Sequence, residues 1–224
     1  IEWSCAPGHP TEETFIQAIK NADAAGQQTK AVLDGDEYVL NGSKVFITNG
    51  KEADIYIIFA MTDKSKGTKG ISAFIVEKGT PGFTFGTKEK KMGIRGSATY
   101  ELIFTDCRIP KENLLGNEGK GFSIAMQTLD GGRIGIAAQA LGLAAGALEA
   151  TIAYVKERKQ FGKPISKFQN TQFQIADMAT KVEAARMMVY RAAMAKDTQK
   201  KYSVEAAMAK LYASEVASEV TSKA

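Results

Sequence analysis

The stretch AAQALGLAAGA, residues 137–147, consists almost entirely of alanine, glycine and leucine. It lies inside a longer run, from Phe122 to about Lys159, that predicts one long helix or two nearly continuous ones, and Pro164 separates this run from the next element. Because the side chains of its middle are small, a neighbouring helix can approach it closely. The second half of the chain is therefore predicted to be a set of packed helices.

Two more helices are predicted after Pro164. In the first, apolar residues recur three or four positions apart and form an amphipathic stripe, which consists of Ile175, Met178, Val182, Ala185, Val189 and Ala192. Ser203 is expected to cap the second of them, whose apolar positions are Ala207, Leu211 and Val220. Such stripes are typical of the core of a helical bundle.

From Thr29 to about Leu115 the sequence predicts strands and turns instead. The dipeptides Asp34-Gly35 and Asn41-Gly42 accept the positive φ angles of tight hairpins. Short connections favour antiparallel pairing, because a parallel crossover needs about a dozen residues or more. A closed or nearly closed β-barrel is expected, since closure hides the sheet edges. The apolar runs predicted as strands are 31–33, 38–40, 45–48, 55–61, 71–76, 83–85 and 100–104.

The predicted fold class is α+β, with an antiparallel β-barrel domain followed by a helical-bundle portion. Residues 1–21 are an unassigned lead in which Thr11 could cap a short helix. The barrel domain is expected over residues 22–116 and the helical domain over 117–224. The last helix runs to the chain end without a stop signal, so the helical domain is expected to be truncated.

Composition narrows the classes of protein. With 224 residues, 44% hydrophobic residues and a formal net charge of +4, the chain fits a soluble globular protein. No stretch is expected to span a membrane, and no charged-then-apolar leader marks secretion. The lysines cluster near turns and form no basic stripe with aromatic residues, which argues against nucleic-acid binding.

Cysteine and histidine usage argues against several kinds of site. Cys5 and Cys107 are the only thiols, so a disulfide framework is not expected. A cytoplasmic location is expected instead. His9 is the only histidine, which argues against a Ser-His-Asp triad and against a two-histidine zinc site. No metal site is predicted. The sequence also contains no Walker loop and no Gly-x-Gly-x-x-Gly motif.

Three motifs carry a resemblance to a known family: KVFITNG at 44–50, LDGGR at 129–133 and ERKQFGKP at 157–164. With them the chain resembles the flavin-dependent acyl-CoA dehydrogenases, and among these the short-chain, butyryl-CoA members most closely. The resemblance extends from about Asp23 to Ala224. It implies FAD as the cofactor, an acyl-CoA substrate, an electron-transferring flavoprotein as partner and a homo-oligomer, which in the family is a tetramer.

The resemblance implies contacts to FAD for four residues. Phe46 would lay its ring against the flavin, and Thr48 would offer its hydroxyl and N–H near flavin N5 and O4, where reduction builds negative charge. Arg158 and Phe161 would reach the ADP part of FAD bound by a neighbouring subunit, because an arginine fork suits a pyrophosphate. Without the resemblance, 46–48 is a strand followed by a turn, and Arg158 is a cation at a helix C-terminus.

The resemblance also implies contacts to the substrate. Asp130 and Arg133, three residues apart on one helical face, would grip the polar part of coenzyme A. Phe122 and Met126 would line the pantetheine channel. The alternative for the first pair is a surface ion pair worth under about 1 kcal/mol. For the second pair the alternative is core packing.

No catalytic base is predicted in this sequence. Some members of the family carry the catalytic glutamate immediately before the arginine that matches Arg133, but here that position is Gly132. The usual base would belong to a later Glu-Gly segment, beyond Ala224. The implied function is α,β-dehydrogenation of a short-chain acyl-CoA, or its reverse. The alternative is an inactive fragment or helical assembly scaffold, and a chain of this length is expected to show no turnover and to bind FAD weakly.

Overall fold

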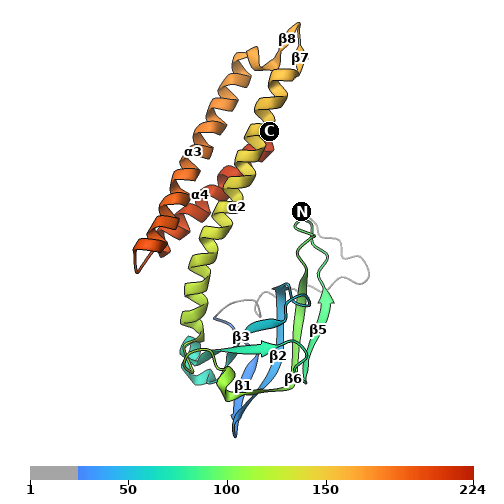
Figure 1. Cartoon of the computed structure of the whole chain (residues 1–224), viewed down its shortest axis with the longest axis vertical. Helices are drawn as coiled ribbons and strands as arrows, with labels where there is room; N and C mark the ends of the chain where they lie inside the picture. Colours follow the sequence, from blue (N-terminus) through green and yellow to red (C-terminus); the bar gives the residue numbers. More distant parts are fainter. Residues whose placement is uncertain (1–24) are drawn as a thin grey trace. The chain divides into compact units, whose positions relative to one another are not determined.

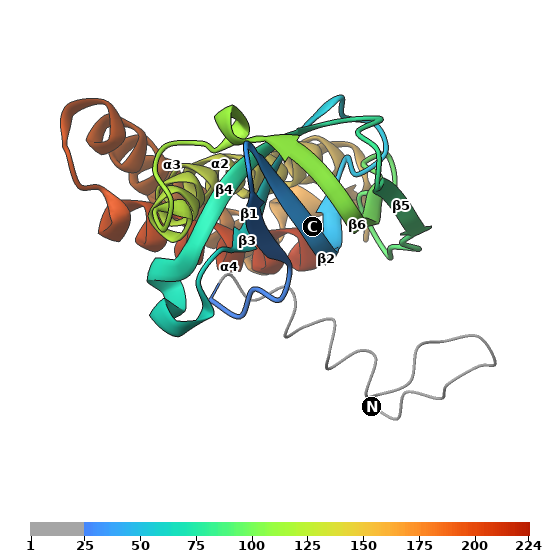
Figure 2. The ribbon, with the colours of Figure 1, turned by 90° about the horizontal axis from the view of Figure 1, so that it is seen from below.

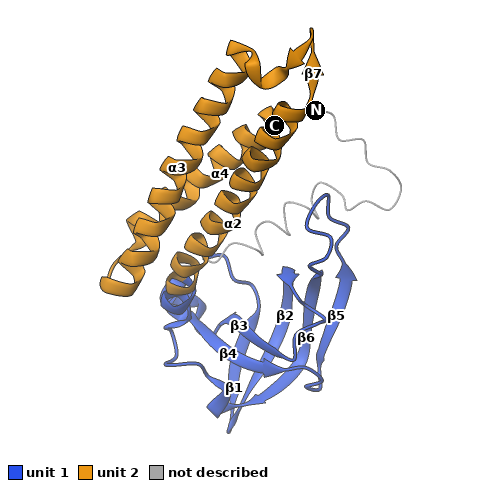
Figure 3. Cartoon of the chain, turned by 45° about the horizontal axis from the view of Figure 1, so that its top comes forward, with its two compact units in different colours: residues 1–125 blue, residues 126–224 orange. Residues whose placement is uncertain are grey.

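The structure is a computed structural model that describes residues 25–224. The chain divides into two compact units, residues 1–125 and 126–224, which Figure 3 shows in different colours. Each unit is described by itself. The domain limits of 22–116 and 117–224 stay a prediction, and the short helix expected in residues 1–21 lies outside the described residues.

A six-stranded sheet forms the first unit (Figure 1). The strand order is β4-β3-β1-β2-β6-β5, and Figure 2 shows β1 beside β2. Two short 3-10 helices, η1 and η2, accompany the strands. The elements are β1 (Lys30–Asp34), β2 (Glu37–Thr48), β3 (Ile55–Met61), η1 (Lys64–Gly70), β4 (Ile71–Glu77), β5 (Phe83–Lys88), β6 (Thr99–Pro110) and η2 (Lys111–Asn113).

The sheet is mixed and is not closed into a barrel, so the predicted antiparallel barrel is not confirmed. β4 and β5 form its two edges. β1 pairs with β2 antiparallel but with β3 parallel, through Lys30 and Met61. The prediction considered only connections between strands adjacent in sequence. β3 pairs across to β1 instead, so β2 and the turn after it supply the length that a parallel crossover needs.

The predicted turn at Asp34-Gly35 is confirmed, since Asp34 pairs with Glu37 and Gly35 has a φ of 64°. The turn predicted at Asn41-Gly42 is wrong. Both residues lie within β2, where a register shift against β6 marks a β-bulge. The Asn41 side chain holds the bulge, because its Oδ1 accepts a hydrogen bond of 2.8 Å from the Asp106 backbone N–H.

A compact apolar cluster forms the core of the first unit. Phe83 lies at its centre, 4.9 Å from the ring of Tyr56 in an edge contact and 4.9 Å from Phe104 in a stacked one. Tyr38 is buried, but its hydroxyl reaches the Glu118 carboxylate at 3.0 Å. The buried members are Ala31, Tyr38, Leu40, Tyr56, Ile58, Ala60, Phe74, Val76, Phe83, Leu102, Phe104, Cys107 and Ile109.

Three long helices dominate the second unit. The first of them begins just before the unit limit and runs through Gly131-Gly132 without a break. A hairpin of two two-residue strands and a short 3-10 helix connect the first helix to the second. The elements are α2 (Gly121–Glu157), β7 (Lys159–Gln160), β8 (Lys163–Pro164), η3 (Ile165–Lys167), α3 (Gln169–Thr198) and α4 (Ser203–Lys223).

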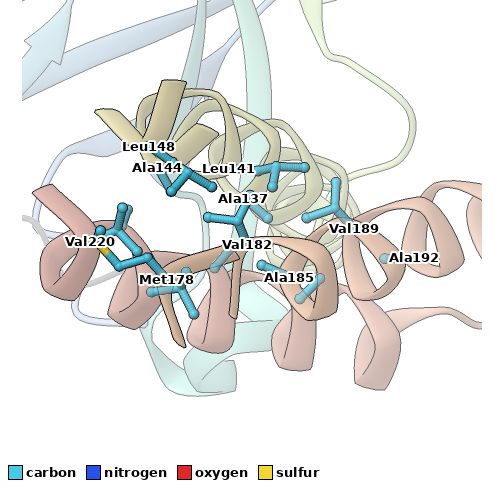
Figure 4. Close-up of a cluster of buried hydrophobic side chains, with 14 residues drawn as sticks. Ala137, Leu141, Ala144, Leu148, Met178, Val182, Ala185, Val189, Ala192 and Val220 are labelled. Atoms are coloured by element: carbon cyan, nitrogen blue, oxygen red, sulfur yellow. The ribbon is translucent and has the colours of Figure 1, made fainter. Parts of the chain in front are cut away.

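Small and branched side chains fill the space between these helices (Figure 4). The predicted stripe of α3 is confirmed from Met178 to Ala192, and α2 contributes Ala137, Leu141, Ala144 and Leu148. Alanines at these contacts leave little side-chain volume between the helices. The residues of 137–147 thus enter the core through one face only.

The α4 stripe was predicted in the wrong register. Ala207 and Leu211 are exposed, and of the predicted positions only Val220 is buried. The buried face consists of Ala206, Ala209, Ala213, Val216, Ala217 and Val220. Alanines on both sides of this helix make the period ambiguous in the sequence. Ser203 does not cap α4 either, because its hydroxyl bonds to Asp130 of α2.

The expectation that no stretch could span a membrane is wrong by length and composition. α2 has 37 residues, and an 18-residue window in it reaches a mean hydropathy of 1.5, with 28% of that window buried. No charged residue lies between Arg133 and Glu149. A single helix of this kind is weak support for a membrane span, because core helices of soluble proteins meet the same criterion.

We expect Gly82→Ala to lower the free energy of unfolding by about 2–4 kcal/mol. The φ of Gly82 is 81°, and a Cβ there would lie 2.3 Å from the Thr105 carbonyl oxygen, so strain and a backbone clash add. Gly79→Ala is the matched control, since its φ is 88° but its Cβ would meet nothing within 4 Å. Urea unfolding of both variants measures the difference, and equal losses would contradict the clash.

Candidate functional site

A cavity of about 500 Å³ opens in the first unit, beside the motif at 44–50. Its size lies within the range of small-molecule and cofactor sites, roughly 300–1,000 Å³. Its walls are mainly apolar, with a few polar side chains from β2 and the segment before β1. The lining residues are Gln27, Lys44, Val45, Phe46, Ile47, Thr48, Asn49, Ala53, Ile55, Tyr56, Ile57, Ile58, Phe59 and Leu102.

A second bulge in β2 places Phe46 at this cavity. The register against β6 shifts between Lys44 and Ile47, and Phe46 within the shift has a φ of 58°. A left-handed conformation is unfavourable for a residue with a Cβ, and bulges are frequent beside functional sites because they redirect a side chain. Phe46 is 43% exposed. Thr48, at the end of β2, lines the same cavity, so the structure brings both predicted residues together.

The turn after Thr48 is held by several hydrogen bonds. The Asn49 N–H donates to the Ala98 carbonyl at 2.8 Å. The buried Tyr56 hydroxyl contacts the carbonyls of Gly50 at 2.7 Å and Ala53 at 2.6 Å. One hydroxyl has a single hydrogen, so it can donate to one of these carbonyls at a time. The Tyr56 side chain and one backbone hydrogen bond thereby fix this turn at the rim of the cavity.

Lys44 is a residue of this cavity that the sequence analysis did not single out. It is 8% exposed, and among the buried side chains of residues 25–224 it is the only charged one. Its ammonium donates to Oε1 of Gln27. Burial lowers the pKa of Lys44 to about 8, because a charged group is poorly solvated there. The signal in the sequence was a lysine two positions before Phe46, on an inward position of a strand.

Asp130 and Arg133 form the ion pair that their spacing allows. Arg133 Nη1 lies 2.5 Å from Asp130 Oδ1. The second carboxylate oxygen of Asp130 accepts a hydrogen bond from the Ser203 hydroxyl of α4. Asp130 therefore links its own helix to the start of α4. This contact was not predicted, because the Ser203 hydroxyl was expected to bond to the backbone of its own helix.

Phe122 and Met126 are both partly buried on α2, Phe122 in the first unit and Met126 in the second. Their partial burial does not distinguish a channel from core packing. The role of both residues in substrate binding stays a prediction.

Arg158 and Phe161 lie at the end of α2 and on the hairpin after it. Phe161 and Gly162 form the two-residue turn between β7 and β8, and their φ angles of 52° and 77° are typical of a type I′ turn. Phe161 is 92% exposed, although its ring contacts Phe168 at a centroid distance of 6.2 Å. A large aromatic residue at positive φ and in solvent is unfavourable on both counts. The contacts of Arg158 and Phe161 to FAD stay a prediction.

Acidic, histidine and cysteine side chains do not gather into a metal site in the part of the chain that the structure describes. No group of three or more of them is placed to hold an ion there.

Two family models match the chain. The model for the acyl-CoA dehydrogenase middle domain matches residues 19–107, and that for the C-terminal domain matches residues 119–224. The short-chain specific acyl-CoA dehydrogenase of Clostridium acetobutylicum is 60% identical over 202 residues, which are 90% of this chain and 53% of that protein. The chain thus spans about half the length of the curated relatives that it matches.

Solved structures show the same likeness. The butyryl-CoA dehydrogenase of Megasphaera elsdenii has 60% sequence identity and a TM-score of 0.88, covering 91% of this chain and 54% of that one. A chain in a structure described as the electron transferring flavoprotein of Acidaminococcus fermentans has 68% identity and a TM-score of 0.87, covering 90% of this chain and 53% of that one.

We expect the stability of the cofactor-free chain to rise between pH 8 and pH 10 because of Lys44. Its pKa of about 8 lies below the usual 10.5, so in this range the unfolded chain binds more protons than the folded one. The gain is about 2–3 kcal/mol. Lys44→Met should remove it, and the difference in unfolding free energy between wild type and variant at pH 7 and pH 10 measures it. A difference independent of pH would contradict the lowered pKa.

We expect Ser203→Ala to lower the free energy of unfolding by about 1 kcal/mol, because a hydrogen bond to a carboxylate between two helices is lost. Ser222→Ala is the control, since its hydroxyl bonds only within α4, to the Ser218 carbonyl. In an Asp130→Asn background the effect of Ser203→Ala should shrink. An unchanged effect in that background would show that the two side chains are not coupled.

Proposed function

We propose that this chain, which belongs to the acyl-CoA dehydrogenase family, forms the middle and C-terminal parts of an FAD-dependent enzyme. The reaction is α,β-dehydrogenation of a short-chain acyl-CoA, or the reverse reduction. The short-chain preference is supported by the relatives from Clostridium acetobutylicum and Megasphaera elsdenii.

The cavity beside the motif at 44–50 is the observation that carries this proposal. Its volume and mixed lining fit the ring system of a flavin. Phe46, held in place by the bulge, would lie against the ring, and Thr48 would donate hydrogen bonds to it. FAD, when bound, accepts a hydride from the β-carbon of the substrate. The described residues contribute the binding and orientation of the ring, and donors where its negative charge develops.

Arg133 and Asp130 would bind the polar part of coenzyme A. Arg133 is 42% exposed, and its guanidinium has N–H groups beyond the one that meets Asp130. Asp130, fixed by Ser203, would keep the arginine in one orientation. Phe122 and Met126 would line the pantetheine channel. Gly132 has no side chain, and we assign no catalytic base to the described residues.

Arg158 and Phe161 support the proposal of a homo-oligomer. An exposed phenylalanine at the tip of a hairpin, three residues after an exposed arginine, fits a nucleotide held by a neighbouring subunit. An electron-transferring flavoprotein is the proposed partner, supported by the description of the Acidaminococcus fermentans structure. A cytoplasmic location is proposed from the free, buried thiol of Cys107 and from the bacterial relatives.

The direct test is the flavin itself. We expect the full-length protein to purify with bound FAD and to show bleaching of the flavin absorption by butyryl-CoA, followed by reduction of an artificial electron acceptor. A protein that folds without binding FAD would contradict the proposal and favour an assembly scaffold.

We expect Arg133→Ala in that protein to raise the KM for acyl-CoA by about 10- to 150-fold, while the FAD spectrum stays intact. Loss of a charge-assisted contact weakens binding by about 1.5–3 kcal/mol. Arg186→Ala is the matched control, because Arg186 also forms an ion pair with a carboxylate three residues away, Glu183. Steady-state kinetics separate the two variants. Equal, small effects would reduce Arg133 to a surface charge.

A further inference from the structure

Lys44 combines burial, charge and position in the proposed flavin cavity. Lysines are almost never fully buried unless they are paired. Lys44 is 8% exposed and lines the same cavity as Phe46 and Thr48. The three residues stand two positions apart along β2, the spacing of one strand face, and the second bulge lies among them. An ammonium group therefore belongs to the wall of this site.

The described residues, 25–224, provide little compensation for the charge of Lys44. The one side-chain hydrogen bond that the structure gives Lys44 goes to the amide oxygen of Gln27, which carries no net charge. None of the ion pairs between residues 25 and 224 includes Lys44. An ammonium has three N–H donors, and burying it without a carboxylate is unfavourable. A methionine of similar length would fill the same space without that penalty.

A buried cation in the wall of a cavity, with no anionic partner among residues 25–224, favours a ligand that carries negative charge. In the proposed reaction the ring gains such charge. A hydride, which is two electrons and one proton, moves from the substrate β-carbon to the flavin, while the α-proton leaves to a base. The oxidised ring is neutral, so it carries one negative charge after the transfer. A nearby ammonium stabilises the second state more than the first.

We propose that Lys44 is an electrostatic residue of the flavin pocket, whose ammonium stabilises the negative charge that the ring gains on reduction. This inference rests on the proposed function. It assigns Lys44 to the ring and not to the pyrophosphate of FAD, because Lys44 shares its cavity with Phe46 and Thr48. The pyrophosphate carries its charge in both redox states, so a contact there would strengthen the binding of both forms equally.

The test is the two-electron midpoint potential of the bound flavin in full-length Lys44→Met. We expect a more negative potential, because reduced flavin loses about ten-fold in affinity relative to oxidised flavin, which corresponds to about 30 mV. Lys44→Arg should restore the wild-type potential, since it retains the charge. Lys30→Met is the control, because Lys30 is an exposed lysine on the neighbouring β1 and does not line the cavity.

The outcomes separate this inference from the proposed function. A wild-type protein that binds no FAD contradicts the proposed function. Bound flavin with an unchanged potential in Lys44→Met overturns the role of Lys44, and so does an equal loss of affinity for both redox forms, which would indicate the pyrophosphate. Thermal unfolding checks that the variant folds, and removal of a buried, unpaired charge is expected to leave its stability unchanged or raise it.

Discussion

The pairing of β2 with β6 is the constraint on which the first unit depends. Both strands have twelve residues, and they remain paired across two register shifts. The first shift is closed by Asn41, which bonds the backbone of Asp106. At the second shift Phe46 is exposed and Lys44 is buried, and both line the same cavity. Lys44, Phe46 and Thr48 stand two positions apart, as residues on one face of a strand do, and they place an ammonium, an aromatic ring and a hydroxyl at one cavity.

The helices of the second unit are organised by small side chains and a few polar links. Alanine faces allow α2, α3 and α4 to share one core. Such faces specify register weakly, since one alanine fills a position as well as the next. Polar contacts add direction: Asp130 joins α2 to α4 through Ser203, and Lys181 joins α3 to α4 through Glu219. The motif at 129–133 thus also connects α2 to α4.

The sequence predicted those parts of the fold in which local signals are strong. The limits of β3, the turn at Gly35 and the stripe of α3 needed only strand runs, an Asp-Gly dipeptide and a helical period. Three features were not predicted from the sequence, because they depend on partners that are distant along the chain. Gly42 serves a bulge against β6 instead of a turn, Ser203 bonds another helix instead of its own backbone, and β3 pairs with β1. Lys44 was not predicted either: its place two positions before Phe46 was visible in the sequence, but its burial follows from the folded sheet.

The hydroxyl of Tyr56 has a consequence for the thermodynamics of binding. It contacts the carbonyls of Gly50 and Ala53 and so orders the turn beside Thr48 without any ligand. A ligand that enters this cavity need not order that turn, so little conformational entropy is lost there on binding. The heat capacity change of association should therefore scale with the apolar surface that the ligand covers. It should lack the large contribution that accompanies folding of a loop.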